Sequence, residues 1–137
     1  ARAVVTRVRT PPRGLPVFSE RPSLLVADDD PALLEVMAGL LHESGYTVFQ
    51  ADSGLAVMDA LEARDFDAIV LDWRMHDATG AELYDWVIDH KPHLVARIVF
   101  LAEGNEQDAP DRPMLRKGQD SQALVGVLRE IVSRERS

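Results

Sequence analysis

The stretch LLVADDDP, from Leu24 to Pro31, sets a pattern that the rest of the chain repeats. Its first four residues are all apolar, which is typical of a strand buried on both faces of a parallel sheet. Three aspartates follow, and Pro31 has the fixed φ that suits the first turn of a helix. The stretch therefore predicts a buried strand that enters a helix through an acidic loop.

Short apolar runs alternate with amphipathic helical patterns from residue 23 onward. The predicted strands cover residues 24–27, 46–49, 68–71, 98–101 and 114–116. Helices with one apolar face are predicted after Pro31, after Ser53, after Gly80 and around residues 124–132. Apolar strands separated by helices indicate a parallel sheet that is covered on both sides. We therefore predict a doubly wound, five-stranded α/β domain.

Charged residues stand at the ends of these predicted strands. Asp28 and Asp29 follow the first strand, Asp72 follows the third, and Lys117 follows the fifth. In doubly wound sheets the ligand crevice lies outside the carboxyl ends of the strands. Acidic groups gathered there, with one cation opposite, indicate a divalent-metal and phosphoryl site. The alternative, a solvated turn and helix N-cap, fits Asp30 better than the aspartates before it.

The charge of the chain is uneven. Residues 1–22 carry five arginines and one glutamate, a net charge of +4, whereas residues 23–137 carry ten basic and 22 acidic groups, a net charge of −12, so the whole chain has a net charge of −8. Phosphate backbones select positive surfaces, so we expect the acidic part to make no direct contact with nucleic acid. Residues 1–22, with three prolines and a glycine between 11 and 16, are predicted to be a basic linker or tail, and residues 23–134 the folded domain.

The chain contains no cysteine, so neither a disulfide framework nor a thiolate metal site is available. It also lacks an apolar stretch near the ~20 residues that span a bilayer. We therefore expect a protein of the reducing cytoplasm that does not insert into a membrane.

Three motifs together make residues 23 to about 134 resemble a response-regulator receiver domain of two-component signalling. They are LLVADDDP, the segment IVLDWRM (Ile69–Met75) with Gly80 five residues later, and MLRKG (Met114–Gly118). The resemblance implies a flavodoxin-like sheet with the strand order 2-1-3-4-5.

The resemblance also implies a role for each charged position. Asp72 would accept a phosphoryl group from a histidine kinase or a histidine phosphotransfer domain, and Lys117 would contact a phosphoryl oxygen. Mg²⁺ would be held by Asp28, Asp29, Asp72 and the backbone carbonyl of Arg74. A counter-cation is needed because two like unit charges at about 4 Å repel by ~4 kcal/mol at an effective dielectric of about 20. Such a domain is not an enzyme for other substrates, because it catalyses only its own phosphorylation and dephosphorylation.

Some positions depart from the usual receiver pattern. Receivers usually carry Thr or Ser at the end of the fourth strand and an aromatic residue at the start of the fifth, and these two residues act as a switch. Ala102 and Met114 stand there instead, so a degenerate switch is expected. His76 replaces a common proline, and it is either a solvated loop histidine or a group that handles metal or phosphate.

Two segments bear on the context of the domain. Residues 103–112 are polar and lack an apolar period, so the fourth receiver helix is predicted to be short or missing, as in receivers attached to hybrid histidine kinases. Residues 4–9 alternate like a strand, which is either the last strand of a preceding kinase domain or part of a disordered tail.

Two functions from different classes remain open after these observations. The first is a phosphoacceptor domain in a phosphorelay, with Asp72 as the acceptor. The second is a degenerate receiver that docks to a protein partner independently of phosphorylation, which Ala102 and Met114 favour.

Overall fold

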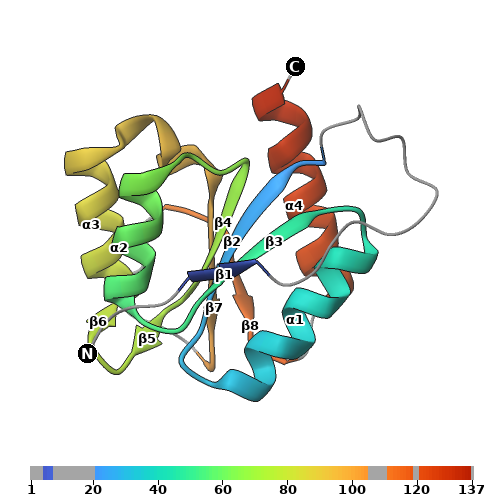
Figure 1. Cartoon of the computed structure of the whole chain (residues 1–137), viewed down its shortest axis with the longest axis horizontal. Helices are drawn as coiled ribbons and strands as arrows, with labels where there is room; N and C mark the ends of the chain where they lie inside the picture. The colour runs from blue at the N-terminus through green and yellow to red at the C-terminus, as the bar shows by residue number, and fades with distance from the viewer. Residues whose placement is uncertain (1–4, 8–20, 105–110, 119–120, 137) are drawn as a thin grey trace.

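The computed structural model describes residues 5–7, 21–104, 111–118 and 121–136 (Figure 1). Its strands are β1 (Val5–Arg7), β2 (Ser23–Ala27), β3 (Thr47–Ala51), β4 (Ala68–Asp72), β5 (Arg74–Met75), β6 (Ala78–Thr79), β7 (Ile98–Ala102) and β8 (Met114–Arg116). Its helices are α1 (Pro31–Glu43), α2 (Gly54–Ala63), α3 (Gly80–His90), the 3-10 helix η1 (Pro92–Arg97) and α4 (Ser121–Arg136). All of the strands and helices predicted from the sequence are present.

The main sheet has the strand order β1-β3-β2-β4-β7-β8. The strands from β3 to β8 in this order are parallel, which confirms the predicted doubly wound topology. β1 adds a sixth strand, which pairs antiparallel with β3. The interpretation of residues 4–9 as a strand of a preceding domain or a tail missed this pairing. An edge strand such as β3 has unpaired backbone groups, and these accept any strand that the chain can bring alongside.

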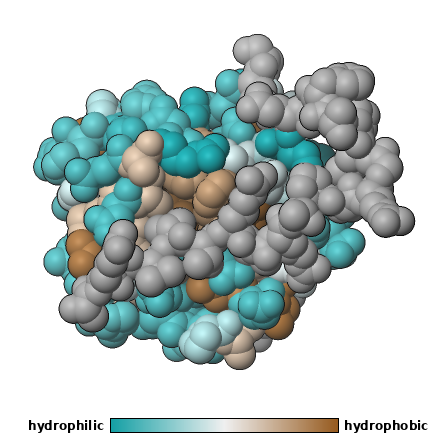
Figure 2. Space-filling view, viewed as in Figure 1, coloured by the Kyte–Doolittle hydropathy of each residue, from teal (hydrophilic) through white to brown (hydrophobic). Residues whose placement is uncertain are grey.

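Helices cover both faces of the sheet (Figure 1). α2 and α3 pack on one face, where they bury alternate strand residues such as Leu25 and Ile69. α1 and α4 pack on the other face, where they bury the neighbouring residues Leu24 and Val70. All four side chains have no exposed surface, which is why these strands are apolar at every position. Figure 2 shows that hydrophilic residues form much of the outline of the visible face, as expected for amphipathic outer helices.

Three helices begin within a few residues of a strand end, and each start is capped. The side chain of Asp30 accepts hydrogen bonds from the first turn of α1, and Ser53 caps α2 in the same way. Thr79 begins α3 with a capping box that includes Glu82. Because the caps fix where each helix starts, the short loops before them are held at the carboxyl edge of the sheet.

The loop after β4 contains an antiparallel hairpin, β5–β6. The hairpin ends at Thr79, and the amide of the next residue, Gly80, donates a hydrogen bond to the carbonyl of Trp73. A Cβ atom at position 80 would lie 2.6 Å from Trp73 Cε3, so only glycine fits between the hairpin and Trp73.

The region between β7 and β8 bears on the prediction of a short or missing fourth helix. Residues 103–104 and 111–113 are not helical, and residues 105–110 lie outside the described part of the chain. A 3-10 helix that was not predicted, η1, precedes β7.

None of the helices in the described parts combines the length and the hydropathy that a membrane crossing requires.

Candidate metal centre

The four charged residues selected from the sequence meet at the carboxyl edge of the sheet. Asp28 and Asp29 follow β2, Asp72 is the last residue of β4, and Lys117 follows β8. β2 and β4 are adjacent parallel strands, so their carboxyl ends lie at the same edge. The tertiary structure therefore brings together residues that are up to 89 positions apart in the sequence, from Asp28 to Lys117.

Asp28 is completely buried. Its Oδ1 atom accepts a hydrogen bond of 2.9 Å from the Asp30 amide, which fixes the turn into α1. Its Oδ2 atom lies 3.1 Å from Lys117 Nζ, and among the described residues no donor has hydrogen-bond geometry toward it. A buried carboxylate oxygen with only this ion pair has room in its coordination for a cation.

Asp72 is 2% exposed and also contacts the lysine. Lys117 Nζ donates a hydrogen bond of 3.1 Å to Asp72 Oδ2, and the Arg74 amide donates one of 3.2 Å to Asp72 Oδ1. Burial, followed by the charge of Asp28, raises the pKa of Asp72 to about 6, against the lowering effect of Lys117 and the Arg74 amide. The carboxyl group is therefore still mostly ionised at pH 7, as a nucleophile requires.

Lys117 makes the only cationic contact to both buried aspartates among the described residues. Its amide donates a hydrogen bond of 2.8 Å to the Ala102 carbonyl, which anchors the residue to the end of β7. Burial lowers the pKa of Lys117, but the contacts with Asp72 and Asp28 outweigh this effect and raise it. The ammonium group is therefore charged throughout the neutral range and is shared by two carboxylates.

Asp29 lies at the exposed side of the cluster. Its Oδ2 atom accepts a hydrogen bond of 2.9 Å from the His76 amide and lies 3.7 Å from His76 Nδ1. His76 has a side chain that is 67% exposed, which agrees with the prediction of a solvated loop histidine better than with a buried ligand. The loop after β4 therefore contacts Asp29 mainly through its backbone.

The residues present fit a divalent cation. Carboxylate oxygens of Asp28, Asp29 and Asp72 lie within 4.8 Å of one another, and oxygen ligands of this kind suit Mg²⁺. The cluster has three carboxylates but only one ammonium group, which pairs with Asp28 and Asp72, so it has an excess of negative charge that a cation would neutralise. The predicted contribution of the Arg74 carbonyl stays a prediction.

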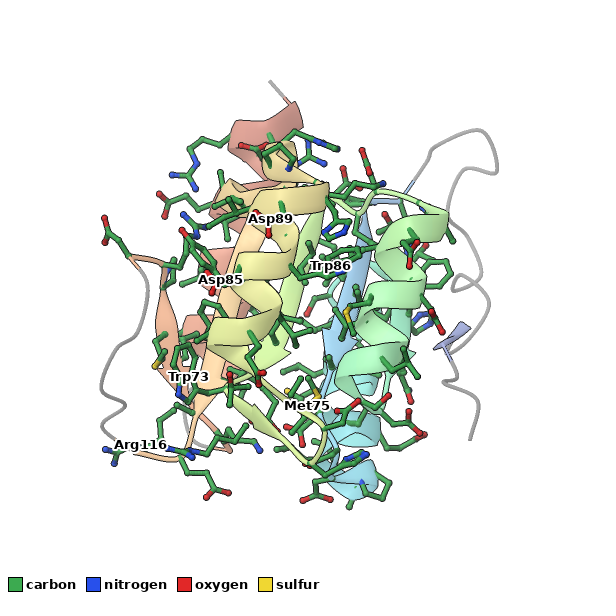
Figure 3. The ribbon with its side chains drawn as sticks, turned by 90° about the vertical axis from the view of Figure 1, so that its left-hand side faces the viewer. Trp73, Met75, Asp85, Trp86, Asp89 and Arg116 are labelled. Atoms are coloured by element: carbon green, nitrogen blue, oxygen red, sulfur yellow. The ribbon has the colours of Figure 1, made fainter. Side chains whose placement is uncertain are left out.

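A pocket beside the cluster gives access to Asp72, although the carboxyl group is largely buried. The lining residues are Asp29, Asp72, Trp73, Arg74, Ala102, Glu103 and Lys117. Figure 3 shows Trp73 and Met75 at the same end of the molecule, below α3. Asp72, Asp29 and Lys117 therefore all line one pocket at this edge of the sheet.

The two switch positions are the last residue of β7, Ala102, and the first residue of β8, Met114. Ala102 lines the pocket and is 3% exposed, and its methyl group offers no hydrogen bond. Met114 opposes Phe100 in the sheet and packs against the core on the α2–α3 face. The structure therefore places an apolar side chain at each position where receivers usually carry a hydroxyl group or an aromatic ring.

Sequence reasoning missed Asp77. This residue lies in the turn of the β5–β6 hairpin, and its carboxylate accepts hydrogen bonds from the amides of Gly54 and Leu55 at the start of α2. Burial raises the pKa of Asp77, but these two hydrogen bonds outweigh it and hold the pKa below its usual value. No local signal could have identified the contact, because the partners are 22 and 23 residues apart.

A family model for the response regulator receiver domain matches residues 24–118. The chain is 33% identical over 93 residues to the transcriptional regulatory protein GlrR of Escherichia coli, covering 67% of this chain and 21% of GlrR. It is 28% identical over 108 residues to the sensor histidine kinase GacS of Pseudomonas protegens, covering 74% of this chain and 11% of GacS. The chain thus spans about a fifth or less of the length of these two relatives.

Solved structures show the same fold. A CheY-like receiver domain protein from Methanospirillum hungatei superimposes with a TM-score of 0.77 at 18% identity, covering 85% of this chain and 98% of that chain. The response regulator TrrA from Thermotoga maritima, in complex with Mg(2+)-BeF, superimposes with a TM-score of 0.73 at 22% identity, covering 80% of this chain and 98% of that chain. At these identities the similarity is one of fold.

Proposed function

Because this chain belongs to the response regulator receiver domain family, we propose that it accepts a phosphoryl group on Asp72 in two-component signalling. The observation that carries the proposal is the shared ion pair of Lys117 with Asp28 and Asp72 beside an open pocket. The donor is a phosphohistidine of a histidine kinase or a histidine phosphotransfer domain, and the proposed location is the cytoplasm.

The proposed reaction begins at the Asp72 carboxylate. One of its oxygens attacks the phosphorus atom, the P–N bond of the phosphohistidine breaks, and the imidazole nitrogen keeps the bonding electrons and takes up a proton. The product is an acyl phosphate on Asp72. Lys117 Nζ, which already contacts the Oδ2 atom, remains as the cation beside the transferred group.

Asp28, Asp29 and Asp72 are the residues that would hold Mg²⁺. When bound, Mg²⁺ supplies the positive charge that the approach of an anionic phosphoryl group to three carboxylates requires. The Arg74 and His76 amides donate to Asp72 and Asp29, and so they orient the carboxylates.

Mass spectrometry of the intact protein tests the proposal. Exposure to acetyl phosphate or phosphoramidate with Mg²⁺ should add a single phosphoryl group to the wild-type chain and none to Asp72→Asn. Lys117→Arg is a second variant for this measurement, because arginine keeps the positive charge but differs from lysine in length and shape. An unchanged wild-type mass under these conditions would remove the phosphoacceptor function.

The second candidate is a receiver that docks to a protein partner regardless of phosphorylation. Ala102 favours it, because the pocket offers no hydroxyl group at this position to sense a bound phosphoryl group. This candidate predicts that Asp72→Asn binds a cognate kinase or phosphotransfer domain as tightly as the phosphorylated wild type does. Calorimetric titration of both forms distinguishes the two candidates.

A further inference from the structure

The β5–β6 hairpin is joined to the start of α2 by one carboxylate. Asp77 Oδ1 accepts a hydrogen bond of 2.8 Å from the Gly54 amide, and Asp77 Oδ2 accepts one of 3.0 Å from the Leu55 amide. Ser53 Oγ accepts from the Ala56 amide at 3.0 Å. Two of these three first-turn amides are thus satisfied by a residue of a distant loop, and only one by the local N-cap.

Close packing accompanies these hydrogen bonds. A Cβ atom added to Gly54 would lie 2.6 Å from Ala78 Cβ and 3.3 Å from Asp77 Oδ1. A methyl group therefore does not fit between the start of α2 and the hairpin. Glycine at position 54 allows the two backbones to approach closely enough for both hydrogen bonds of Asp77.

The same hairpin contacts the carboxylate cluster at two points. The Arg74 amide donates to Asp72 Oδ1, and the His76 amide donates to Asp29 Oδ2. His76 directly precedes Asp77 in the chain. A displacement of Asp77 would therefore move the amide that orients the exposed carboxylate Asp29.

We propose that Asp77 is a positioning residue, which docks the β5–β6 hairpin on α2 and thereby holds Asp29 and Asp72 in the arrangement that binds a divalent cation. The cation part of this inference rests on the proposed function. The docking part does not, because it concerns hydrogen bonds within the metal-free protein. Supporting residues of this kind typically change metal affinity by about 10- to 100-fold when they are removed.

Calorimetric titration of Mg²⁺ tests the cation part with Asp77→Ala and two controls. Asp77→Ala should weaken Mg²⁺ binding about tenfold. Ser53→Ala removes the other cap of α2 but leaves the hairpin docked, so it should lower the thermal stability and leave the affinity unchanged. Asp52→Asn removes a neighbouring negative charge, and it should change the affinity by no more than about twofold because salt screens exposed charges.

Gly54→Ala disturbs the same contact between the β5–β6 hairpin and α2 without changing any charge. Alanine is a better helix former than glycine, so the substitution favours α2 by itself. Its methyl group would nevertheless displace Ala78 and the hairpin, and Mg²⁺ binding should weaken as in Asp77→Ala. If Asp77→Ala weakens binding no more than Asp52→Asn does, or if Gly54→Ala binds like the wild type, the cation part of the inference is overturned.

Hydrogen exchange of the His76 amide in the metal-free protein tests the docking part separately. The exchange should be faster in Asp77→Ala and unchanged in Ser53→Ala, with Asp77→Asn intermediate because its amide oxygen retains one acceptor. Equal exchange in Asp77→Ala and the wild type would overturn the docking. A wild-type chain that binds no Mg²⁺ and gains no phosphoryl group would instead remove the proposed function, and the exchange data would still decide whether Asp77 positions the hairpin.

Discussion

The two sides of the pocket at Asp72 differ in their chemistry. On the side of β2 and β4, three carboxylates and the ammonium of Lys117 form a network held by backbone amides. On the side of β7, Ala102 presents a methyl group, and Met114 of β8 packs against the core of the α2–α3 face. The charged residues that would bind a phosphoryl group are thus all present, whereas the polar side chains that would sense it are missing at positions 102 and 114.

Removal of the cation should have the largest effect on the charged side. Lys117→Ala leaves Asp28 and Asp72 buried without a counter-charge, and it should destabilise the metal-free protein by about 4 kcal/mol at neutral pH. Urea unfolding measures this change. Lys91→Ala is the matched control, because its pair with Asp65 is exposed and should contribute less than about 1 kcal/mol. A similar decrease in the free energy of unfolding in both variants would mean that the buried ion pairs stabilise the protein no more than an exposed pair does.

The raised pKa of Asp72 predicts how the stability depends on pH. The unfolded carboxyl group loses its proton near 3.8, whereas the folded group does so near 6, so ionisation opposes folding. This penalty is absent below pH 3.8, grows as the pH rises to about 6, and stays constant above it at about 3 kcal/mol. Without Mg²⁺, Asp72→Asn should therefore be more stable than the wild type at pH 8 and lose this advantage near pH 4. A pH-independent difference would contradict the raised pKa.

Mg²⁺ should relieve the electrostatic repulsion among Asp28, Asp29 and Asp72. At a hundred times its Kd, the cation should stabilise the folded protein by about 2.7 kcal/mol, as measured by the shift of Tm. Asp29→Asn should reduce this gain, whereas Asp59→Asn, on the exposed face of α2, should preserve it. A Tm that does not respond to millimolar Mg²⁺ would count against the metal centre while leaving the charge repulsion intact.

The smallest effect is expected on the apolar side. Ala102→Thr introduces a hydroxyl group at the pocket wall, at a cost in stability of about 1 kcal/mol because the site is closely packed. The rate of phosphorylation should change little. Phosphorylation should, however, alter the amide hydrogen exchange of β7 in Ala102→Thr more than it does in the wild type. Equal responses in β7 of both proteins would indicate that a different residue senses the phosphoryl group.

Much of the fold followed from local patterns. The apolar runs at residues 24–27, 68–71 and 98–101 predicted buried parallel strands, and the positions of Asp28, Asp72 and Lys117 after strand ends placed them at one edge. This worked because strand burial and helix periodicity are properties of adjacent residues, and because parallel strands carry their carboxyl ends to the same edge.

The sequence by itself determined the alternation of strands and helices, the family and the residues of the charged cluster. Only the tertiary structure decided that β1 pairs with β3, that a hairpin follows Asp72, and that Asp77 joins this hairpin to α2. These features depend on hydrogen bonds between segments far apart in the chain. A backbone amide or a single carboxylate has no preferred distant partner until packing brings the segments together, so no local pattern could specify them.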